Sequence, residues 1–293
     1  MMHTYLRTIG FSELKNRAEV EKLLSKVVKE ATERRILKKE DGTARAELSM
    51  EFAENIGITI CGEYDEKNEF HIEHYFPYFR GKNISTIEEL YVSKRVDTDA
   101  YTGMCDDYRL GVSLIFYLQN ALDFLEHRSS YSGSYSGPIT LSALALEGKV
   151  LLPVEKTEHQ INNGKAEIKH RNQLITEARQ GNQEAIDSLT IDDIDMYTMI
   201  TKRIQKEDVY SIVDTTFIPY GSESDNYTVI GTIHSCRLMK NTETGEELYT
   251  LLIECNHICF EICINRNDIL GEPIPGRRFK GIVWMQGKTD FLE

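Results

Sequence analysis

Residues 248–264 read LYTLLIECNHICFEICI and contain two runs of strand-forming residues on either side of a polar dipeptide. Apolar and cysteine side chains dominate both runs, and short runs of this kind bounded by turn residues are typical of β-strands. Asn256-His257 is the turn that we expect between them. Further strands are expected at 210–217, 227–238 and 279–286. Five strands within about 80 residues predict a small β-barrel of the OB or SH3-like kind over residues 209–293.

The segment before the expected barrel, residues 156–208, has a different character, because it is polar and carries helix signals. One helix is expected over roughly 165–180, where Gly181 is a typical C-terminal glycine. A second helix is expected to start near Thr190, because Thr190-Ile191-Asp192-Asp193 resembles a capping box. We interpret residues 156–208 as a helical connector between two domains.

The N-terminal part, residues 1–155, mixes helix and strand patterns. Apolar residues at helical spacing predict an amphipathic helix over 18–37, and residues 56–64 and 69–79 predict a β-hairpin. Residues 44–53 fit a strand or a helix.

The second half of this part is expected to hold a core helix that begins at Leu110, where leucines recur at helical spacing as far as Leu125. Two strands, 138–145 and 150–154, are expected around a turn at Glu147-Gly148-Lys149. The fold class is therefore α+β: a domain over 1–155 with a mixed or antiparallel sheet and helices, the connector, and the C-terminal barrel.

Composition excludes several classes of protein. The 293 residues carry a formal net charge of −13, and a chain this acidic is a poor general binder of nucleic acid. A membrane-spanning helix needs about 20 apolar residues, more than the uncharged run at 110–122 provides. The N-terminus lacks the basic and apolar segments of a secretory signal. We therefore expect a cytoplasmic protein with no membrane partner, whose six cysteines are reduced thiols.

Metal-ligating residue types are concentrated at the 255–263 strands. On one straight strand, alternate residues would share a face and could offer thiolates and an imidazole to zinc. Thiolates spaced along one strand do not close a tetrahedral site unaided, and a turn at Asn256-His257 would divide the set. We therefore interpret these residues as half-buried small side chains and expect no metal or cofactor. The set is Cys255, His257, Cys259, Glu261 and Cys263.

Four carboxylates form a candidate ligand-binding loop: Asp97, Asp99, Asp106 and Asp107. Asp97-Thr98-Asp99 matches the spacing of carboxylates that hold a divalent cation, because hard cations prefer oxygen ligands. The alternative is a solvated loop in which Asp106 and Asp107 precede a helix. Cys105 lies between these carboxylates, and we considered it as a nucleophile paired with His71 or His74, although nothing in the sequence brings them together.

A second candidate ligand-binding set comprises Arg277, Arg278, Lys280 and Trp284. Its cations could bind an anion, and Trp284 could stack on a base of single-stranded nucleic acid. Residues 220–293 nevertheless hold more acidic than basic side chains, which argues against nucleic acid. An aromatic hairpin, with Tyr75, Phe76, Tyr78 and Phe79 around Pro77, is expected to form core or a recognition surface.

Several stretches together resemble one family. They are residues 5–11, Tyr108-Arg109-Leu110-Gly111, residues 188–195, Ile218-Pro219-Tyr220-Gly221, and Gly271-Glu272-Pro273 followed by residues 276–281. The whole chain resembles an uncharacterised full-length family of similar length from Firmicutes, mainly clostridia, catalogued as a domain of unknown function. The resemblance implies a bacterial cytoplasmic protein and carries no activity or catalytic residue with it.

The leading hypothesis is a non-enzymatic cytoplasmic binding or adaptor protein that acts through its β-barrel and aromatic hairpin. The expected partner is a protein or a second copy of the chain. No nucleotide-binding or serine-hydrolase motif is present, and no catalytic residue is assigned. The alternative is an enzyme with a carboxylate site around Asp97–Asp107, with or without a divalent metal. A third hypothesis is single-strand nucleic-acid binding by the barrel.

Overall fold

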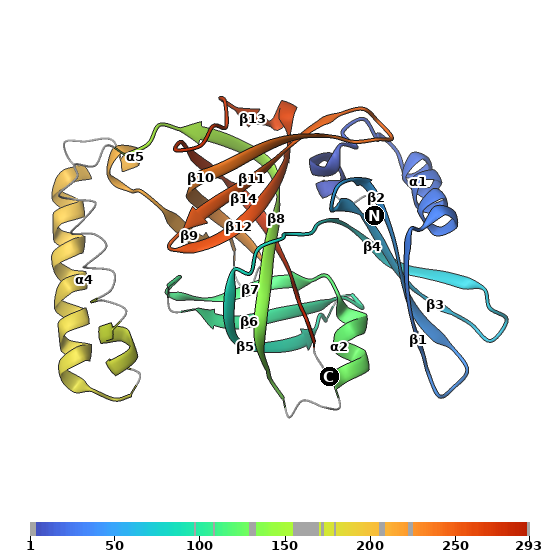
Figure 1. Ribbon diagram of the computed structural model, residues 1–293, viewed down its shortest axis with the longest axis horizontal. Helices are drawn as coiled ribbons and strands as arrows, with labels where there is room; N and C mark the ends of the chain where they lie inside the picture. Colours follow the sequence, from blue (N-terminus) through green and yellow to red (C-terminus); the bar gives the residue numbers. More distant parts are fainter. Residues whose placement is uncertain are drawn as a thin grey trace. The chain divides into compact units, whose positions relative to one another are not determined.

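The computed structural model describes residues 4–96, 98–107, 109–128, 133–154, 170, 173–178, 180–204, 209–221 and 225–291. The chain divides into two compact units (Figure 1). The first contains Met1–Leu151 together with Thr215–Glu293, and the second contains Leu152–Asp214. Most of the residues that we expected in separate N-terminal and C-terminal domains therefore lie in the same unit.

The first unit is mostly β, with a large sheet and few helices. Its helical elements are η1 (Thr4–Ile9), α1 (Arg17–Glu30), α2 (Ala121–His127) and η3 (Arg266–Asp268). The strands of its first half are β1 (Glu33–Lys38), β2 (Ala44–Ala53), β3 (Ile56–Tyr64), β4 (Phe70–Phe79), β5 (Thr86–Lys94), β6 (Tyr101–Asp107), β7 (Val112–Leu118) and β8 (Tyr135–Leu151). The strands of its second half are β9 (Thr216–Pro219), β10 (Asn226–Lys240), β11 (Glu247–Cys255), β12 (Ile258–Asn265), β13 (Ile269–Leu270) and β14 (Arg278–Thr289).

A four-stranded antiparallel sheet, in the order β1-β2-β3-β4, packs against α1. The helix begins at Asn16, whose side chain accepts a hydrogen bond from the Glu19 backbone N–H, and it buries an apolar stripe that includes Val20 and Val27. We expected this helix to continue to residue 37. It ends at Glu30, because Glu33–Lys38 pair with β2 and satisfy their backbone groups there.

The hairpin expected at 56–64 and 69–79 is confirmed as β3 and β4. Asp65 shapes its turn by accepting hydrogen bonds from the backbone N–H groups of Lys67 and Glu69, and Asn68 takes a positive φ of 63°. The ambiguous segment at 44–53 is strand β2. β4 is an edge strand of this sheet, so it pairs with β3 on one side and its other edge has no partner strand within the sheet.

The ten-stranded sheet contains two closed rings of paired strands. β10, β11, β12, β8 and β14 pair in succession, and β14 pairs back to β10. β8, β5, β6, β7 and β14 close a second ring that shares the β8–β14 pair. Figure 1 shows the long green β8 running past both the orange and red C-terminal strands and the teal β5–β7 strands. The C-terminal strands therefore do not close by themselves, because β8 fills the gap between β12 and β14.

The expected core helix from Leu110 is wrong, because this segment forms strand β7 followed by the short helix α2. Leu114, Phe116 and Leu118 are fully buried, so the apolar positions also satisfy the two-residue period of a strand. Pairing with β6 and β14 satisfies the backbone of this strand.

The two strands expected around Gly148 are instead one continuous strand, β8, of 17 residues. A Cβ atom at Gly148 would lie 2.5 Å from the Phe279 ring, so glycine is needed here for close packing rather than for a turn. Gly148 pairs with Gly281 of β14, and the strand continues through the expected turn.

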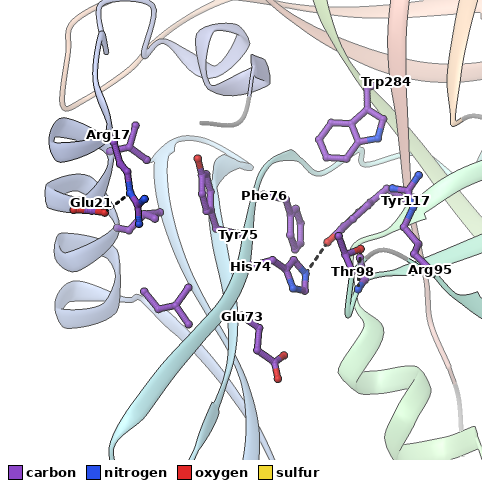
Figure 2. A pocket seen from close by; sticks show the side chains of 14 residues that line it. Arg17, Glu21, Glu73, His74, Tyr75, Phe76, Arg95, Thr98, Tyr117 and Trp284 are labelled. Carbon is purple, nitrogen blue, oxygen red and sulfur yellow. Dashed lines mark hydrogen bonds and ion pairs between the residues drawn. The ribbon is translucent and has the colours of Figure 1, made fainter. Parts of the chain in front are cut away.

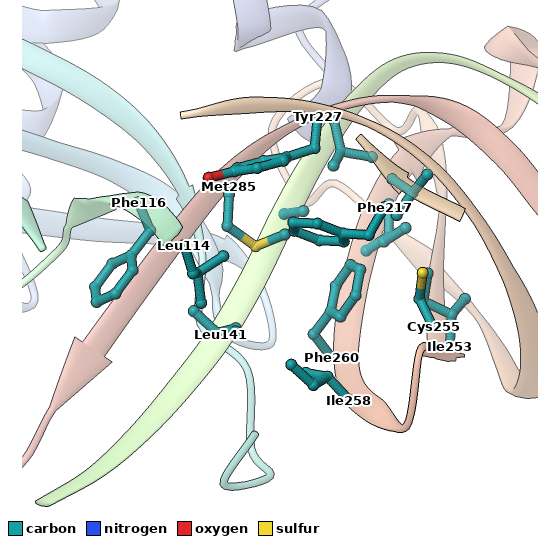
Figure 3. Close-up of a cluster of buried hydrophobic side chains, with 14 of the residues drawn as sticks. Leu114, Phe116, Leu141, Phe217, Tyr227, Ile253, Cys255, Ile258, Phe260 and Met285 are labelled. Atoms are coloured by element: carbon teal, nitrogen blue, oxygen red, sulfur yellow. The ribbon is translucent and has the colours of Figure 1, made fainter. Parts of the chain in front are cut away.

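Two hydrophobic clusters hold the first unit together. One lies within the ten-stranded sheet and includes Phe217, Tyr227, Phe260 and Met285 (Figure 3). The Phe217 and Tyr227 ring centroids are 4.3 Å apart. The other joins residues of η1, α1 and the four-stranded sheet to β7, β12 and Trp284 of β14, so segments far apart in the chain share one core.

The second unit contains α4 (Gln183–Ile204) and α5 (Val209–Ile212). α4 starts at Gln183 rather than near Thr190, because the Asn182 side chain accepts a hydrogen bond from the Glu184 backbone N–H. Thr190 lies inside the helix, and its hydroxyl donates to the Ile186 carbonyl. Residues 173–178 are helical, but most of the helix expected over 165–180 lies outside the described residues.

Candidate functional site

A pocket of about 500 Å³ lies between α1, the edge strand β4 and the segment that joins β5 to β6 (Figure 2). Its wall on β4 runs from Ile72 to Phe76, and Tyr117 of β7 and Trp284 of β14 complete it. A volume in this range is typical of sites that enclose a small molecule. The aromatic hairpin therefore contributes one wall of a concave site.

Aromatic rings form the inner end of this pocket. The Phe76 and Tyr117 ring centroids are 4.6 Å apart, and those of Tyr117 and Trp284 are 5.2 Å apart. The Tyr5 ring lies behind Trp284, with their centroids 5.1 Å apart. Figure 2 shows Phe76, Tyr117 and Trp284 converging from three different strands. Tilted and edge-to-face rings of this kind give a rigid apolar inner wall.

Asp225 fixes the orientation of the Trp284 ring. Its buried carboxylate accepts a hydrogen bond of 2.9 Å from Trp284 Nε1 and lies 3.2 Å from Arg95 Nη1. Burial and the charge of Asp225 raise the pKa of Tyr5 to about 12, so this phenol remains protonated at neutral pH. The Arg95 charge is thus balanced by a carboxylate from a distant part of the sequence.

His74 and Tyr117 place a neutral polar pair beside these rings. His74 Nε2 and the Tyr117 hydroxyl are hydrogen-bonded at 3.2 Å. Burial lowers the pKa of His74, and burial raises the pKa of Tyr117 well above its ordinary value, so both groups are uncharged at neutral pH. His74 Nδ1 is buried and has no hydrogen-bond partner among the described residues. An unpaired buried polar atom is uncommon in proteins and is a reason to suspect a functional site.

Behind His74 and Tyr117, a second cavity of about 30 Å³ has room for a water molecule. Glu47, Cys61 and His74 lie opposite one another on β2, β3 and β4, so their side chains share one face of the sheet. Burial raises the pKa of Glu47 to about 8, although its carboxylate accepts a hydrogen bond from the Leu122 N–H. Burial raises the pKa of the Cys61 thiol, and the nearby Glu47 charge adds to this effect.

The structure separates the three predicted carboxylates that it describes. Asp99 lies beside the small cavity and forms an ion pair with Lys94, whose hydrogen bond lowers the Asp99 pKa. Asp106 and Asp107 lie at the other end of β6, while Asp97 lies outside the described residues. The carboxylates of Asp99 and Asp107 therefore do not converge on one point.

Asp106 and Asp107 have local structural partners. The Asp107 carboxylate is buried and accepts hydrogen bonds from Thr86 Oγ1 at 2.6 Å and from Arg109 Nε at 2.9 Å. These hydrogen bonds lower its pKa against the opposing effect of burial. Asp106 accepts a hydrogen bond from Ser113 Oγ at 2.6 Å. Cys105 between them is buried, and burial raises its pKa to about 12, which disfavours the nucleophilic thiolate.

The second predicted set is also divided between different surroundings. Trp284 is 4% exposed and lines the inner end of the large pocket, away from Arg277, Arg278 and Lys280. Arg278 is buried, and Arg277 donates a hydrogen bond of 3.0 Å to the Glu272 carbonyl. Lys280 lines a different pocket, of about 550 Å³, beside β13.

The predicted turn at Asn256-His257 is confirmed and divides the set at 255–263 between β11 and β12. Cys255 and Cys263 are fully buried, and Glu261 is buried and accepts a hydrogen bond from the Lys82 N–H. These three side chains are therefore part of the protein interior. His257 and Cys259 have more exposed surroundings.

Sequence reasoning missed Glu47, Arg95 and Tyr117 as residues of the pocket region. Glu47 alternates with the apolar residues Ala46 and Leu48, a pattern that predicts a solvated strand face. That face is instead covered by α2, which a single sequence does not reveal.

None of the described helices is long and apolar enough to cross a lipid bilayer.

No curated protein and no solved structure matches the chain. A family model with the description "Domain of unknown function, E. rectale Gene description (DUF3881)" matches residues 6–287, which are nearly the whole chain. The resemblance to a full-length family of unknown function is therefore confirmed, and the protein belongs to this family.

Proposed function

We propose that this protein is a non-enzymatic binding protein whose aromatic hairpin helps to enclose a small, planar and largely apolar molecule. The observation that carries the proposal is the pocket of about 500 Å³, with Phe76, Tyr117 and Trp284 at its inner end. These three rings are 2%, 5% and 4% exposed and are held rigidly by their packing, so a ligand that contacts their exposed parts orders little additional side chain. His74 and Tyr117 supply the few directed polar groups that orient a ligand in such a site.

The charges around the pocket favour an uncharged ligand. Arg95 is paired with Asp225, and Arg17 at the rim lies 2.7 Å from Glu21. Because each arginine is paired with a carboxylate, the two contribute little positive electrostatic potential that would attract an anion. The neutral His74–Tyr117 pair can donate and accept hydrogen bonds, so a carbonyl, hydroxyl or ring nitrogen on the ligand fits the proposal better than a phosphate.

The single tryptophan of the chain provides the experiment, because Trp284 lines the pocket. The probe is N-phenyl-1-naphthylamine, an uncharged dye that fluoresces in apolar sites, followed by a library of neutral aromatic fragments that compete with it. We expect energy transfer from Trp284 to the bound probe and its loss when a neutral fragment displaces the probe. The proposal fails if the probe shows no transfer from Trp284 and no fragment changes the Trp284 emission.

A matched pair of variants locates the binding. Ile72 and Ile36 are similarly exposed isoleucines, at 46% and 49%, on the two edge strands of the same sheet, and only Ile72 lines the pocket. We expect Ile72→Arg to weaken fragment binding at least tenfold because it places a charge against an apolar ligand. Ile36→Arg should leave binding unchanged. Equal effects of the two variants would place the binding elsewhere.

An enzyme is the second candidate, and Glu47 is the specific observation that favours it. A carboxyl group with a pKa of about 8 is protonated at neutral pH and is suited to general acid catalysis. It lines the small cavity together with His74 and Tyr117, which also border the large pocket. If a bound fragment is converted, Glu47→Gln should abolish its conversion and preserve binding. This proposal replaces the carboxylates around Asp97–Asp107 with Glu47 as the acid.

The remaining expectations are proposals that rest on the same fold. The ring of β10, β11, β12, β8 and β14 has the five strands of an OB-like barrel, and we propose that it acts as one. We also propose a cytoplasmic location and a protein partner or second copy. Native mass spectrometry of protein without a histidine tag measures the oligomeric state directly, and fractionation of the source cells tests the location.

A further inference from the structure

The β11–β12 hairpin brings a carboxylate and a thiol to the same place. Asn256 and His257 form its turn with positive φ values of 49° and 64°, a geometry that L-residues seldom adopt. Glu254 of β11 lies directly opposite Cys259 of β12, so their side chains share one face. The turn places His257 beside the same carboxylate, and His257 Nδ1 lies 3.3 Å from Glu254 Oε1.

A β-bulge in the neighbouring strand adds a second imidazole. Thr232 pairs with Glu254 and Ile233 with Ile253, but the next pair is Ser235 with Leu252, so His234 is the extra residue. Bulges commonly redirect a side chain. His234 Nε2 lies 2.8 Å from Glu254 Oε2. The two oxygens of one carboxylate therefore each face an imidazole nitrogen from a different element.

We propose that His234, Glu254 and Cys259, with His257 as a fourth donor, form a binding site for a divalent transition metal, of which Zn²⁺ fits best. The donor atoms of the first three residues all lie within 4.8 Å of one another. Donors in a tetrahedral zinc site are roughly 3.3 to 3.8 Å apart, as follows from bonds of about 2.0 to 2.3 Å. Side-chain rotations alone therefore close the site around an ion.

The donor set selects the metal. Two imidazoles and a thiolate favour a borderline or soft ion over magnesium or calcium, which prefer oxygen ligands. Burial and the Glu254 charge raise the pKa of the Cys259 thiol, while Arg109 opposes this. Metal binding at this site would consequently release a proton from Cys259.

The surroundings hold this hairpin in place and leave it open to solvent. Arg109 Nη1 donates a hydrogen bond of 3.1 Å to the His257 carbonyl, and Thr215 Oγ1 donates one of 2.8 Å to Asn256 Oδ1. The His234 and His257 side chains are 45% and 52% exposed, so an ion reaches the donors without any opening of the fold. Exposed histidine–glutamate pairs contribute little to stability, and a stability role alone does not account for two of them on one carboxylate.

A second cluster, Asp65, Glu69 and His71, has donor atoms at similar separations but a different role. The Asp65 carboxylate accepts hydrogen bonds from the backbone N–H groups of Lys67 and Glu69, which shape the β3–β4 turn. This cluster also lacks a thiol. It therefore serves as the control site.

The test uses the full chain without a histidine tag, stripped with a chelator and titrated with Co²⁺ and then Zn²⁺. We expect one Co²⁺ per chain with a thiolate-to-cobalt charge-transfer band and visible bands typical of tetrahedral coordination, which Zn²⁺ should abolish. Cys259→Ser should remove the charge-transfer band, and His234→Gln should weaken Zn²⁺ binding about tenfold or more.

Control variants distinguish this site from adventitious binding. Cys236→Ser alters another half-buried cysteine, and His71→Gln alters the control site; both should keep the charge-transfer band and the affinity. Circular dichroism melts establish that each variant is folded. The proposal is overturned if folded wild-type protein shows no charge-transfer band, if Cys259→Ser keeps it, or if His71→Gln weakens binding as much as His234→Gln.

Discussion

Replacement of Glu47 by glutamine should stabilise the protein at high pH and have little effect at low pH. Glu47 is half-buried between β2 and α2, and burial raises its pKa from 4.5 to about 8. A carboxyl with a raised pKa destabilises the folded state only where the unfolded chain ionises. Its cost is therefore absent below about pH 4.5, grows as the pH rises, and is complete above about pH 8.

The magnitude follows from the two pKa values. At about 1.36 kcal/mol per pH unit, the interval from 4.5 to about 8 corresponds to at most about 5 kcal/mol. Because water reaches part of the side chain, we expect roughly 2 to 3 kcal/mol of added stability in Glu47→Gln above pH 8. Glutamine has nearly the same shape and retains an acceptor for the Leu122 N–H, which lies 3.2 Å from Glu47 Oε1.

Urea denaturation of wild type and Glu47→Gln at about pH 4.5, 7 and 8.5 measures this difference. Glu51→Gln provides the control, since Glu51 is an exposed carboxylate on the same strand. The gap between wild type and Glu47→Gln should widen with pH, while Glu51→Gln should follow wild type. A gap that is constant with pH, or a loss of stability in Glu47→Gln above pH 8, would refute the raised pKa.

Three further substitutions test the core and the hairpin. Phe260→Ala removes a fully buried ring that packs against Phe217 and should lower the free energy of unfolding, measured by urea denaturation, by about 3 to 5 kcal/mol. A loss below about 1 kcal/mol would contradict this packing. Tyr227→Phe should lower the free energy of unfolding by about 1 to 3 kcal/mol, because the Tyr227 hydroxyl accepts a hydrogen bond from the Ile115 N–H at 2.7 Å and donates one to the Ile115 carbonyl. An unchanged urea midpoint would indicate that water replaces the lost hydroxyl group. His257→Gly should raise the melting temperature, because glycine adopts a positive φ without strain. The same variant should bind Zn²⁺ more weakly. A lower melting temperature would show that the turn is not strained.

The elements that the sequence predicts correctly are those with local signals. The β3–β4 hairpin was predictable because a polar tetrapeptide separates two runs of strand-forming residues, and Asn256-His257 was predictable as a turn for the same reason. The segment after Leu110 was mispredicted because its leucines fit both a helical and a two-residue period. Gly148 was mispredicted as a turn residue, because the sequence does not distinguish a glycine that packs against Phe279 from a glycine that forms a turn.

The candidate sites depend on contacts that a single sequence does not contain. Glu47, Cys61 and His74 become neighbours only through the register of three strands. His234 joins Glu254 and Cys259 through a bulge, which has no sequence signature in this chain. The sequence did identify His257 and Cys259 as residues of metal-ligating types, but not the strand that supplies the additional imidazole.

The shared β8–β14 pair has a consequence for folding during synthesis. A ribosome releases β8 long before β12 and β14, which are its partners along much of its length. Until then the part of this 17-residue strand that does not pair with β5 presents unpaired backbone groups, and exposed strand edges of this kind promote aggregation. The nascent chain therefore has to protect β8, and a fragment that stops at residue 151 should aggregate where the full chain does not. Pairings between strands this far apart in sequence are also slow to form, so refolding from urea should be slow for a chain of this size.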